Sequence, residues 1–383
     1  MNLAPGIVDF ANELTLIRRD IHAHPEIGFE ENRTSQLVAE HLQAWGVEVH
    51  RAIGGTGVVG VISGKGGGRR IGLRADMDAL PMAEATGVAH ASKHPGVFHG
   101  CGHDGHTTML LGAARHLAQT RNFAGEVVLI FQPAEEGLGG ARRMIDDGLF
   151  ERFPCDEIYG LHNWPGAPLG RISLTRGVAM AAADSFDIHI SGRGAHGAQP
   201  QHAIDPVMVA AAIAQALQTI VSRNVDPLKA AIVSVTQIHA GSAYNVIPQT
   251  AFLGGTIRTF DQDVRDLIAQ RITTLARSIA EGFGAEADVR VEPRFPALRN
   301  DDGLAEGAMK IAADIVGQGL AEYDELPKTG SEDFADMLAL VPGAYLMLGQ
   351  GDGPALHNPR YDFNDEALPI GATLLARLAE ARA

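Results

Sequence analysis

A glycine-rich segment of this chain carries one thiol and several imidazoles in close succession. The segment reads Phe98-His99-Gly100-Cys101-Gly102-His103-Asp104-Gly105-His106. Cysteine thiolate and histidine nitrogen are ligands that Zn²⁺ and neighbouring divalent metals favour. The glycines on both sides of Cys101 let the backbone turn the thiol and the imidazole of His103 toward one ion. The residue types and their spacing therefore predict part of a metal site.

Further candidate ligands follow apolar segments that have the character of β-strands. They are Glu135, Glu136, His162 and His357. Ligand sites in open α/β sheets collect at the carboxyl ends of strands, so we expect these side chains to meet the glycine-rich segment in space. Sulfur and nitrogen donors together with carboxylates suit one or two transition-metal ions.

The adjacent pair Glu135 and Glu136 suits a division of labour in metal-assisted hydrolysis. One carboxylate can hold an ion while its neighbour takes the proton from a water molecule that the metal has activated. A third acid would orient the base or a ligand. Asp76 and Asp78, after the strand-like run 70–75, are the candidates for this role.

Length and composition restrict the class of protein. A chain of 383 residues is too long for one ordinary core, so we expect two domains, one of them inserted in the other. The net charge of −15 argues against nucleic acid and against an anionic membrane as partners, which leaves a small molecule. No apolar run approaches the roughly 18 residues that span a bilayer. With two cysteines and a charged N-terminal segment, the chain is expected to be cytoplasmic.

Strand-like and helical segments alternate through residues 1–176. Helical spacing is found at 7–23, 31–45, 107–119 and 142–147, and strand-like runs at 47–53, 57–63, 70–75, 126–131 and 157–161. Such alternation predicts an α/β domain built on a central sheet, which we expect to be mixed. It resumes after residue 296, with helical patterns at 301–317, 331–340 and 366–381 and a strand at 344–348.

Between residues 177 and 295 the order of elements is different. Strands are expected at 185–191, 231–239, 250–259 and 288–291, and helices at 206–221 and 263–281. The order β-α-β-β-α-β is the ferredoxin-like arrangement. We therefore expect a ferredoxin-like domain at 177–295 to interrupt an α/β catalytic domain made of 1–176 and 296–383.

Several motifs in the chain resemble the M20 metallopeptidase family, and in particular its amidohydrolase subgroup. They are Asp76-Met77-Asp78-Ala79-Leu80-Pro81, the segment 99–106, Gln132-Pro133-Ala134-Glu135-Glu136-Gly137, Gly160-Leu161-His162, Gly194-Ala195-His196-Gly197, Asn245-Val246-Ile247-Pro248, Ser331-Glu332-Asp333-Phe334 and Leu356-His357. The subgroup includes hippurate hydrolases, N-acyl-amino-acid amidohydrolases and plant auxin-conjugate hydrolases. The resemblance covers nearly the whole chain.

The resemblance implies a site for two divalent metal ions. Their ligands would be Cys101, His103, Glu136, His162 and His357, with Cys101 bridging the ions. Glu135 would be the general base that activates water, and Asp76 would buttress the site. Zn²⁺ fits such donors, and Mn²⁺, Co²⁺ and Ni²⁺ stay open because they differ mainly in affinity and availability.

The resemblance also implies that the inserted domain serves as a dimerisation or lid domain. His196 would reach the active site of a partner subunit and stabilise an oxyanion there. Asn245 and Arg258 match positions that hold the carboxylate of the substrate. We therefore expect a homodimer or a higher homo-oligomer.

Together these features predict a metal-dependent amidohydrolase that cleaves N-acyl amino acids, hippurate-like or N-acetyl, to a carboxylate and a free amino acid. One alternative is a dipeptidase or carboxypeptidase of the same architecture. Another is a hydrolase in which Cys101 is the nucleophile, and a third is a catalytically silent binding protein. The role of His106, three residues after His103, is left open.

Overall fold

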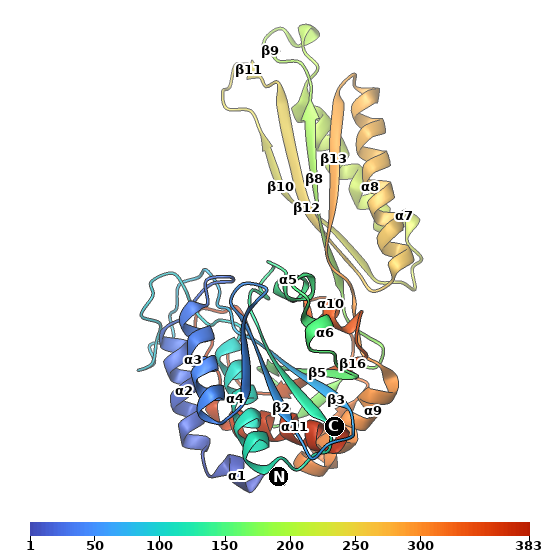
Figure 1. Ribbon diagram of the computed structural model, residues 1–383. Helices are drawn as coiled ribbons and strands as arrows, with labels where there is room; N and C mark the ends of the chain where they lie inside the picture. Colours follow the sequence, from blue (N-terminus) through green and yellow to red (C-terminus); the bar gives the residue numbers. More distant parts are fainter. The chain divides into compact units, whose positions relative to one another are not determined.

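The computed structural model describes residues 1–383 and divides the chain into two compact units (Figure 1). Unit 1 consists of Met1–Ala179, Arg299–Leu326 and Glu332–Ala383, and unit 2 of Met180–Leu298 and Pro327–Ser331. We expected the insertion at 177–295. Unit 2 thus also takes in the short segment 327–331, which we had placed in the catalytic domain.

Unit 1 is built on a mixed eight-stranded sheet of order β1-β2-β4-β3-β5-β16-β6-β15. Its strands are β1 Glu48–Ile53, β2 Gly57–Ser63, β3 Arg70–Asp76, β4 Glu126–Gln132, β5 Glu157–Trp164, β6 Ile172–Leu174, β15 Ala321–Tyr323 and β16 Gly343–Gly349. Strands β4, β3, β5 and β16 run parallel, whereas β2 joins β4 and β6 joins β16 in antiparallel fashion. The mixed sheet confirms the predicted α/β class.

The parallel strands are buried along most of their length, as expected when helices cover both faces of a sheet. Their registers bring polar residues to one edge. Asp76 at the end of β3 is paired with Gln132 at the end of β4, and His162 of β5 is paired with Met347 of β16. The carboxyl ends of these strands therefore lie together, as the prediction of a site at this edge requires.

The helices of unit 1 flank this sheet. They are α1 Pro5–Val8, α2 Ala11–Ala23, α3 Asn32–Ala44, α4 His103–Thr120, α5 Gly140–Asp146, α6 Leu149–Arg152, α9 Asp302–Val316, α10 Phe334–Leu338 and α11 Leu368–Arg382. Helix α4 packs against α2 and α11. It begins at His103, before the start that we expected at 107, so His103 and His106 stand on its first turn.

Unit 2 contains an antiparallel four-stranded sheet of order β10-β12-β8-β13. Its strands are β8 Ala182–Ser191, β10 Ala231–Ala240, β12 Thr250–Thr259 and β13 Glu286–Phe295, and its helices are α7 Pro206–Asn224 and α8 Gln262–Gly282. Both helices lie on one face of the sheet (Figure 1). The chain order β8-α7-β10-β12-α8-β13 is the β-α-β-β-α-β order that the sequence predicts.

Helix α7 is long and apolar enough to span a membrane by length and composition alone, which we did not expect of any segment. Its packing explains its composition. Val209, Ile213, Leu217 and Ile220 form one buried face against the core of unit 2. The helix is therefore a core helix of this unit.

Several short elements escaped the sequence analysis. They are β7 Val178–Met180, β9 Ala195–His196, β11 Val246–Ile247, β14 Leu298–Arg299, the 3₁₀ turns Pro200–His202, Gln318–Leu320 and Asp365–Ala367, and also α6, β6 and β15. Segments of two to four residues are too short to show a strand or helix period. The predicted helix at 331–340 is wrong in its bounds, because only Phe334–Leu338 is helical.

A buried charge network joins α2 to α4 and to the segment before α11. The fully buried guanidinium of Arg18 pairs with Asp104 at 3.4 Å, Asp362 at 2.9 Å and Asp365 at 2.7 Å. On the next turn of α2, His22 Nδ1 lies 2.8 Å from Asp104 Oδ2. Buried charges are stable only when they are paired, so this network fixes where helix α4 begins.

His22 should make the free energy of unfolding depend on pH. Burial alone would lower the pKa of His22, but the hydrogen bond and charge of Asp104, helped by Glu84, raise it to about 9. A folded-state pKa above the ordinary 6.5 means that His22 contributes stability fully below pH 6.5, and that this stability is lost as pH rises through about 9. The contribution is on the order of 3 kcal/mol.

Urea unfolding of the wild type and of His22→Gln between about pH 6 and pH 9 tests this expectation. The wild type should lose stability across the range, and the variant should lose much less. Equal slopes for the two proteins would contradict the role given to His22.

Candidate metal centre

A glycine directly before α4 shapes the first part of the site. Gly102 has φ +90°, and a Cβ atom there would lie 2.4 Å from Asn163 Nδ2 and 2.6 Å from the Tyr361 hydroxyl. Neither the conformation nor the space allows a side chain. This tight turn places Cys101 and His103, both buried, on either side of it.

The remaining predicted ligands come from three other segments of unit 1. Glu136 follows β4, and His162 lies within β5, which runs on to Trp164 instead of ending at 161 as we expected. His357 stands in the loop after β16 with φ +62°, and its N–H donates to the carbonyl of Gly100 at 2.8 Å. The side chain of His357 is 53% exposed. It is thus the most accessible of the five.

The five predicted ligands converge in two groups that share one residue. Ligand atoms of Cys101, His103 and His162 lie within 4.8 Å of one another, and so do those of Cys101, Glu136 and His357. Cys101 Sγ is 3.6 Å from His162 Nε2, and His357 Nε2 is 3.3 Å from Glu136 Oε1. The sharing of the thiol between the groups suits two ions with one bridging ligand.

Hydrogen bonds leave the ligand atoms free to bind cations. His162 Nδ1 lies 2.7 Å from the carbonyl of Asn163, which can only accept, so Nδ1 carries the proton and Nε2 keeps its lone pair. His103 Nδ1 faces the carboxylate of Asp78 at 3.2 Å, while its buried Nε2 has no hydrogen-bond partner. Glu136 Oε1 is also buried and meets the His357 imidazole at 3.3 Å, so this carboxylate keeps unused lone pairs. Unsatisfied buried acceptors are costly, and divalent cations would satisfy them, so the residues fit such ions.

Burial and nearby charges shift the pKa values of the site in different directions. Hydrogen bonds to Cys101 and Glu136 raise the pKa of His357 to about 10. Burial lowers the pKa of His103, but the charges of Asp76 and Cys101 outweigh it and raise that pKa.

Burial has the larger effect on three other groups. It raises the pKa of Glu135, with repulsion from Glu332 and Glu136 adding to the effect, and it raises the pKa of the Cys101 thiol. It also lowers the pKa of His162. A bound cation favours anionic and neutral ligands, so it would lower the pKa of Glu135 and Cys101 and keep His162 unprotonated.

Glu135 is placed beside the ligands. Its Oε2 lies 4.0 Å from His103 Nε2, and these atoms form a third group of potential donors together with Glu136. The side chain of Glu135 is 10% exposed, so the carboxylate is largely shielded from bulk water. Such a group can exchange a proton with a molecule held among the ligands.

Two aspartates at the end of β3 support the ligands in different ways. Asp78 holds His103 through Oδ1 and accepts the backbone N–H of Glu136 at 2.9 Å through Oδ2. Asp76 faces Arg74 at 2.7 Å and lies 3.8 Å from His103 Nε2. We assigned the buttressing role to Asp76, but Asp78 makes the direct hydrogen bonds to two candidate ligands.

His106 is a cross-link within unit 1. It lies within ligand distance of Asp76 and His103, but both of its ring nitrogens are in use. Its Nε2 accepts the backbone N–H of Asn163 at 3.0 Å, so Nδ1 carries the proton and donates it to Asp76 Oδ1 at 2.6 Å. The open question about His106 is thus answered by its hydrogen bonds, which leave no lone pair for a metal.

A buried guanidinium lies behind the site. Arg74 donates to Asp76, to Glu332 at 2.8 Å and to Asp333 at 3.1 Å, and its Nε donates to Gln132 at 2.8 Å. The sequence analysis gave no role to Glu332 and Asp333. They lie more than 250 residues from Arg74 in sequence, so no local spacing could indicate the contact.

The other predicted site residues lie in unit 2. His196 of β9 is paired with Val246 of β11 and is exposed, and its Nδ1 accepts the N–H of Ala198. Asn245 is joined to the same two-stranded ribbon through Gly197. Arg258 is half-buried near the far end of β12, about 26 Å along the strand from Thr250, which follows the ribbon closely in sequence. The structure does not bring Arg258 together with the His196 and Asn245 of its own chain.

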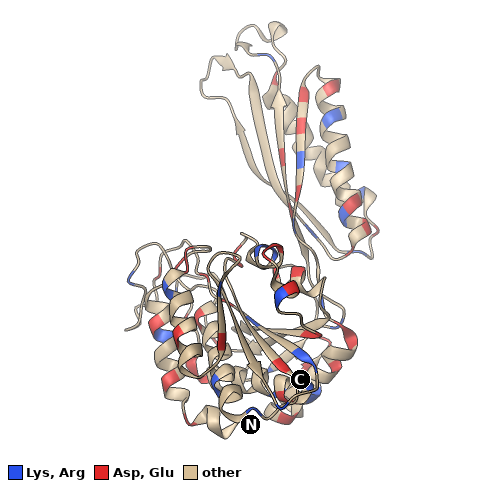
Figure 2. Cartoon of the chain, viewed as in Figure 1, with Lys and Arg blue, Asp and Glu red and all other residues tan.

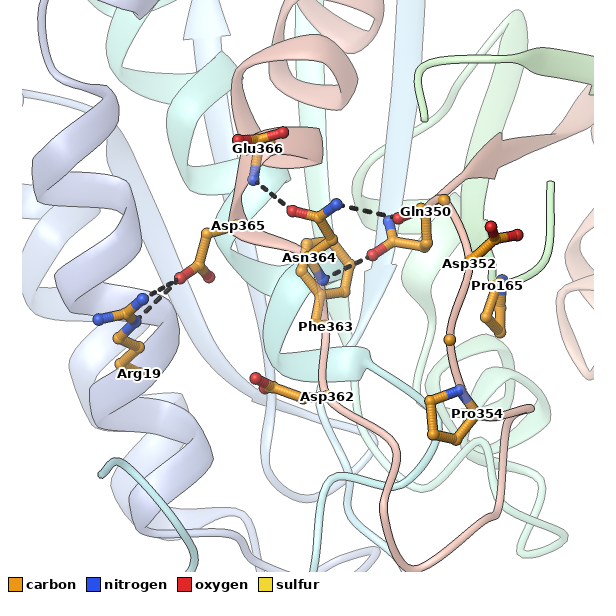
Figure 3. A pocket seen from close by; sticks show the side chains of 12 residues that line it. Arg19, Pro165, Gln350, Asp352, Pro354, Asp362, Phe363, Asn364, Asp365 and Glu366 are labelled. Carbon is orange, nitrogen blue, oxygen red and sulfur yellow. Dashed lines mark hydrogen bonds and ion pairs between the residues drawn. The ribbon is translucent and has the colours of Figure 1, made fainter. Parts of the chain in front are cut away.

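A separate pocket of about 400 Å³ lies beside α2 and the loop between β16 and α11 (Figure 3). Asp365 pairs with Arg19 at its wall, and Asn364 is hydrogen bonded to Gln350. None of the predicted site residues lines this pocket. The concentration of candidate ligands, and not this pocket, therefore marks the site.

Comparison with known proteins shows the family of this chain. A family model described as peptidase family M20/M25/M40 matches residues 72–381 of the chain. This chain belongs to that family. The family is one of peptidases, relatives are named hydrolases and one solved neighbour is described as metal binding, so the predicted class of metal-dependent amidohydrolase is confirmed.

Individual relatives of this M20 protein are similar over nearly its full length. It is 43% identical to the hippurate hydrolase of Campylobacter jejuni, over 99% of both chains. It is 40% identical to the N-acetyl-L-cysteine deacetylase of Bacillus subtilis, over 93% of this chain and 85% of that protein. The crystal structure of the YXEP protein of Bacillus subtilis, described as a dinuclear metal binding peptidase from the M20 family, has a TM-score of 0.85 and 34% identity and covers 98% of each chain.

Loss of Asp78 should weaken metal binding. Asp78→Ala leaves His103 Nδ1 and the N–H of Glu136 without their acceptor, so both ligands lose their orientation. We expect metal affinity to fall about 10- to 100-fold, measured by competition with a chromogenic chelator. Asp146→Ala, on the exposed end of α5, is the control and should bind metal like the wild type. Unchanged affinity of Asp78→Ala would remove this residue from the site.

Proposed function

We propose that this M20 protein hydrolyses the amide bond of N-acyl amino acids, with hippurate-like and N-acetyl amino acids as the substrates. One observation carries the proposal. A buried carboxylate, Glu135, lies beside five potential metal ligands that form two groups with Cys101 in common. The likeness to a hippurate hydrolase and to an N-acetyl-L-cysteine deacetylase supports this substrate class.

The metal ions and their ligands form the first part of the proposal. Cys101, His103, Glu136, His162 and His357 would hold two divalent ions, which supply Lewis-acid polarisation and a lowered pKa for water when bound. Zn²⁺ suits these donors, and Mn²⁺, Co²⁺ or Ni²⁺ are the alternatives that a reconstitution series would rank.

Glu135 performs the proton transfers. Its carboxylate takes a proton from the attacking water as the new C–O bond forms at the amide carbonyl carbon. It then gives the proton to the amide nitrogen as the C–N bond breaks. The new carboxylic acid then loses its proton to the released amine, so the products are a carboxylate and a free amino acid with a protonated amine, and atoms and charge balance. Burial, which raises the pKa of Glu135, also favours the protonated form that must donate to the leaving nitrogen.

Unit 2 is proposed to act as the dimerisation and lid domain. The neutral ring of His196 accepts at Nδ1 and therefore offers Nε2–H as a donor for the oxyanion in the partner subunit. Asn245 and Arg258 are proposed to hold the substrate carboxylate. Because Arg258 lies about 26 Å along β12 from the ribbon that carries His196, one site using all three needs residues from two copies.

One edge strand of the unit 2 sheet supports a homodimer. Strand β10 is at the edge and carries no Lys, Arg, Asp or Glu, in contrast to α8 (Figure 2). Ile232 and Ile238 on this strand are 38% and 55% exposed. Edge strands without charges are templates for pairing with another chain. A small-molecule substrate and a cytoplasmic location complete the proposal.

Replacement of the base should abolish turnover while metal binding is retained. Glu135→Gln keeps the shape of the side chain but cannot take a proton, so kcat on hippurate and N-acetyl amino acids should fall about 10²- to 10⁴-fold. Metal content, measured by mass spectrometry of the protein reconstituted with Zn²⁺, should stay at the wild-type value. Unchanged turnover by Glu135→Gln would overturn the mechanism.

The same assay decides the class of substrate. Chelator-stripped protein, with and without added metal, is given hippurate, N-acetyl amino acids and dipeptides. Metal-restored release of a free amino acid from the acylated compounds is the expected result. Activity on dipeptides alone would show a peptidase of the same architecture, and metal-independent activity abolished by alkylation would show Cys101 to be a nucleophile.

Mixing two inactive variants tests the contribution of the partner subunit. Glu135→Gln keeps His196, and His196→Ala keeps Glu135. After subunit exchange, about half of the dimers are mixed and each holds one complete site, so activity should return to about a quarter of the wild-type value. No recovery, with mixed dimers shown by native mass spectrometry, would place His196 outside the partner's site.

A further inference from the structure

The turn that carries Glu135 and Glu136 begins with a strained residue. Ala134 has φ +54°, a left-handed conformation that costs a residue with a Cβ atom roughly 1–2 kcal/mol. The turn leads directly from buried β4 to α5, and the N–H of Gly140 donates back to the carbonyl of Ala134 at 3.0 Å. This conformation sets the direction in which the two glutamates leave the strand, so something must hold it.

Glu31 makes the contact that holds this residue. Its Oε1 accepts the N–H of Ala134 at 2.8 Å, and its Oε2 accepts the hydroxyl of Thr56. Glu31 stands at the start of α3, is fully buried, and lies 103 residues from Ala134 in sequence. The carboxylate thus joins the N-terminal helices and the β1–β2 region to the turn that follows β4.

The segment before α3 also packs tightly on this turn. A Cβ atom on Gly28 would lie 2.9 Å from both Cα and Cβ of Ala134 and 2.7 Å from Leu138 Cδ1. The backbone at Gly28 therefore closes one side of Ala134 while Glu31 holds its N–H. Ala134 cannot relax to an ordinary conformation without breaking these contacts.

We propose that Glu31 is a positioning residue for the hydrolysis. By holding the left-handed backbone of Ala134, it directs Glu135 toward the reacting water and leaves Glu136 directed toward the metal ligands. The inference rests on the proposed function, because it takes Glu135 to be the base. Small displacements of a catalytic group reduce rates strongly, so we expect loss of the Glu31 hydrogen bond to lower kcat.

The positioning role depends on the hydrogen bonds of Glu31 and not on its charge. Burial raises the pKa of Glu31 to about 7, so the ionised carboxyl is opposed by its surroundings. Glutamine has the same shape and no charge. Its carbonyl oxygen can accept the N–H of Ala134, and its amide can donate to the hydroxyl of Thr56. The proposal therefore requires the acceptor at Oε1 and not the charge.

Three single variants and one double variant test the role of Glu31. Glu31→Gln should keep kcat within about twofold of wild type, because both hydrogen bonds persist. Glu31→Ala should lower kcat about 10- to 100-fold with little change in KM, because the base is misplaced while the substrate contacts stay. Glu31→Ala with Ala134→Gly should recover a large part of the lost kcat, because glycine adopts positive φ without strain. Glu30→Ala, at the exposed neighbouring acid, is the matched control and should behave as wild type.

The outcomes separate this inference from the proposed function. All rates are measured on protein reconstituted with Zn²⁺ and well below the melting temperature of each variant, with metal content determined alongside. Full kcat in Glu31→Ala, while Glu135→Gln is inactive, would overturn the positioning role alone. The same loss in Glu31→Gln as in Glu31→Ala, or no recovery in the double variant, would also overturn it. Full activity of Glu135→Gln would instead overturn the proposed mechanism.

Discussion

The catalytic unit depends on the pairing of buried charges. Arg74, fully buried in β3, faces Asp76, Glu332 and Asp333, so one guanidinium serves three buried acids. Burial and repulsion from Glu332 raise the pKa of Asp333, although Arg74 opposes this. Breaking a buried pair leaves an uncompensated charge, which is far more costly than the loss of a surface pair. These ion pairs join Arg74, which precedes unit 2 in the chain, to Glu332 and Asp333, which follow it, next to the candidate metal ligands.

The turn between β4 and α5 shows how these charges become a site. Carboxylates of Glu31 and Asp78 accept the backbone N–H groups of residues 134 and 136 in the turn, and Asp333 accepts that of residue 141 at the start of α5. The three acids come from three different segments. Asp78 and Asp333 are in turn held by His103 and by Arg74. The position of Glu135 is consequently a property of the whole unit and not of the loop that carries it.

Local chemistry could be predicted from the sequence, and distant pairing could not. Some features can be recognised within about ten residues of sequence. They are the glycine-flanked Cys101 and His103, the adjacent glutamates and the buried strands, and from them the sequence analysis expected these ligands to meet at one edge of the sheet. The starting point of α4 was missed because Asp104 is fixed by Arg18 and His22 from another helix. The roles of Glu31, Glu332 and Asp333 were missed for the same reason, since a buried ion pair or hydrogen bond leaves no periodic signal in the sequence. The division of unit 2 into two chain segments also depends on contacts that no local pattern shows.

The accessible position of His357 has a thermodynamic consequence. This residue is the only predicted ligand from the C-terminal part of unit 1, and its loop is held to the rest of the donor set by the backbone bond to Gly100 and by the contact with Glu136. Metal ions bound there would act as a cross-link between parts of the chain more than 200 residues apart. The free energy of metal binding would then stabilise that loop against local unfolding. Removal of the metal by a chelator would destabilise the loop more than the central sheet.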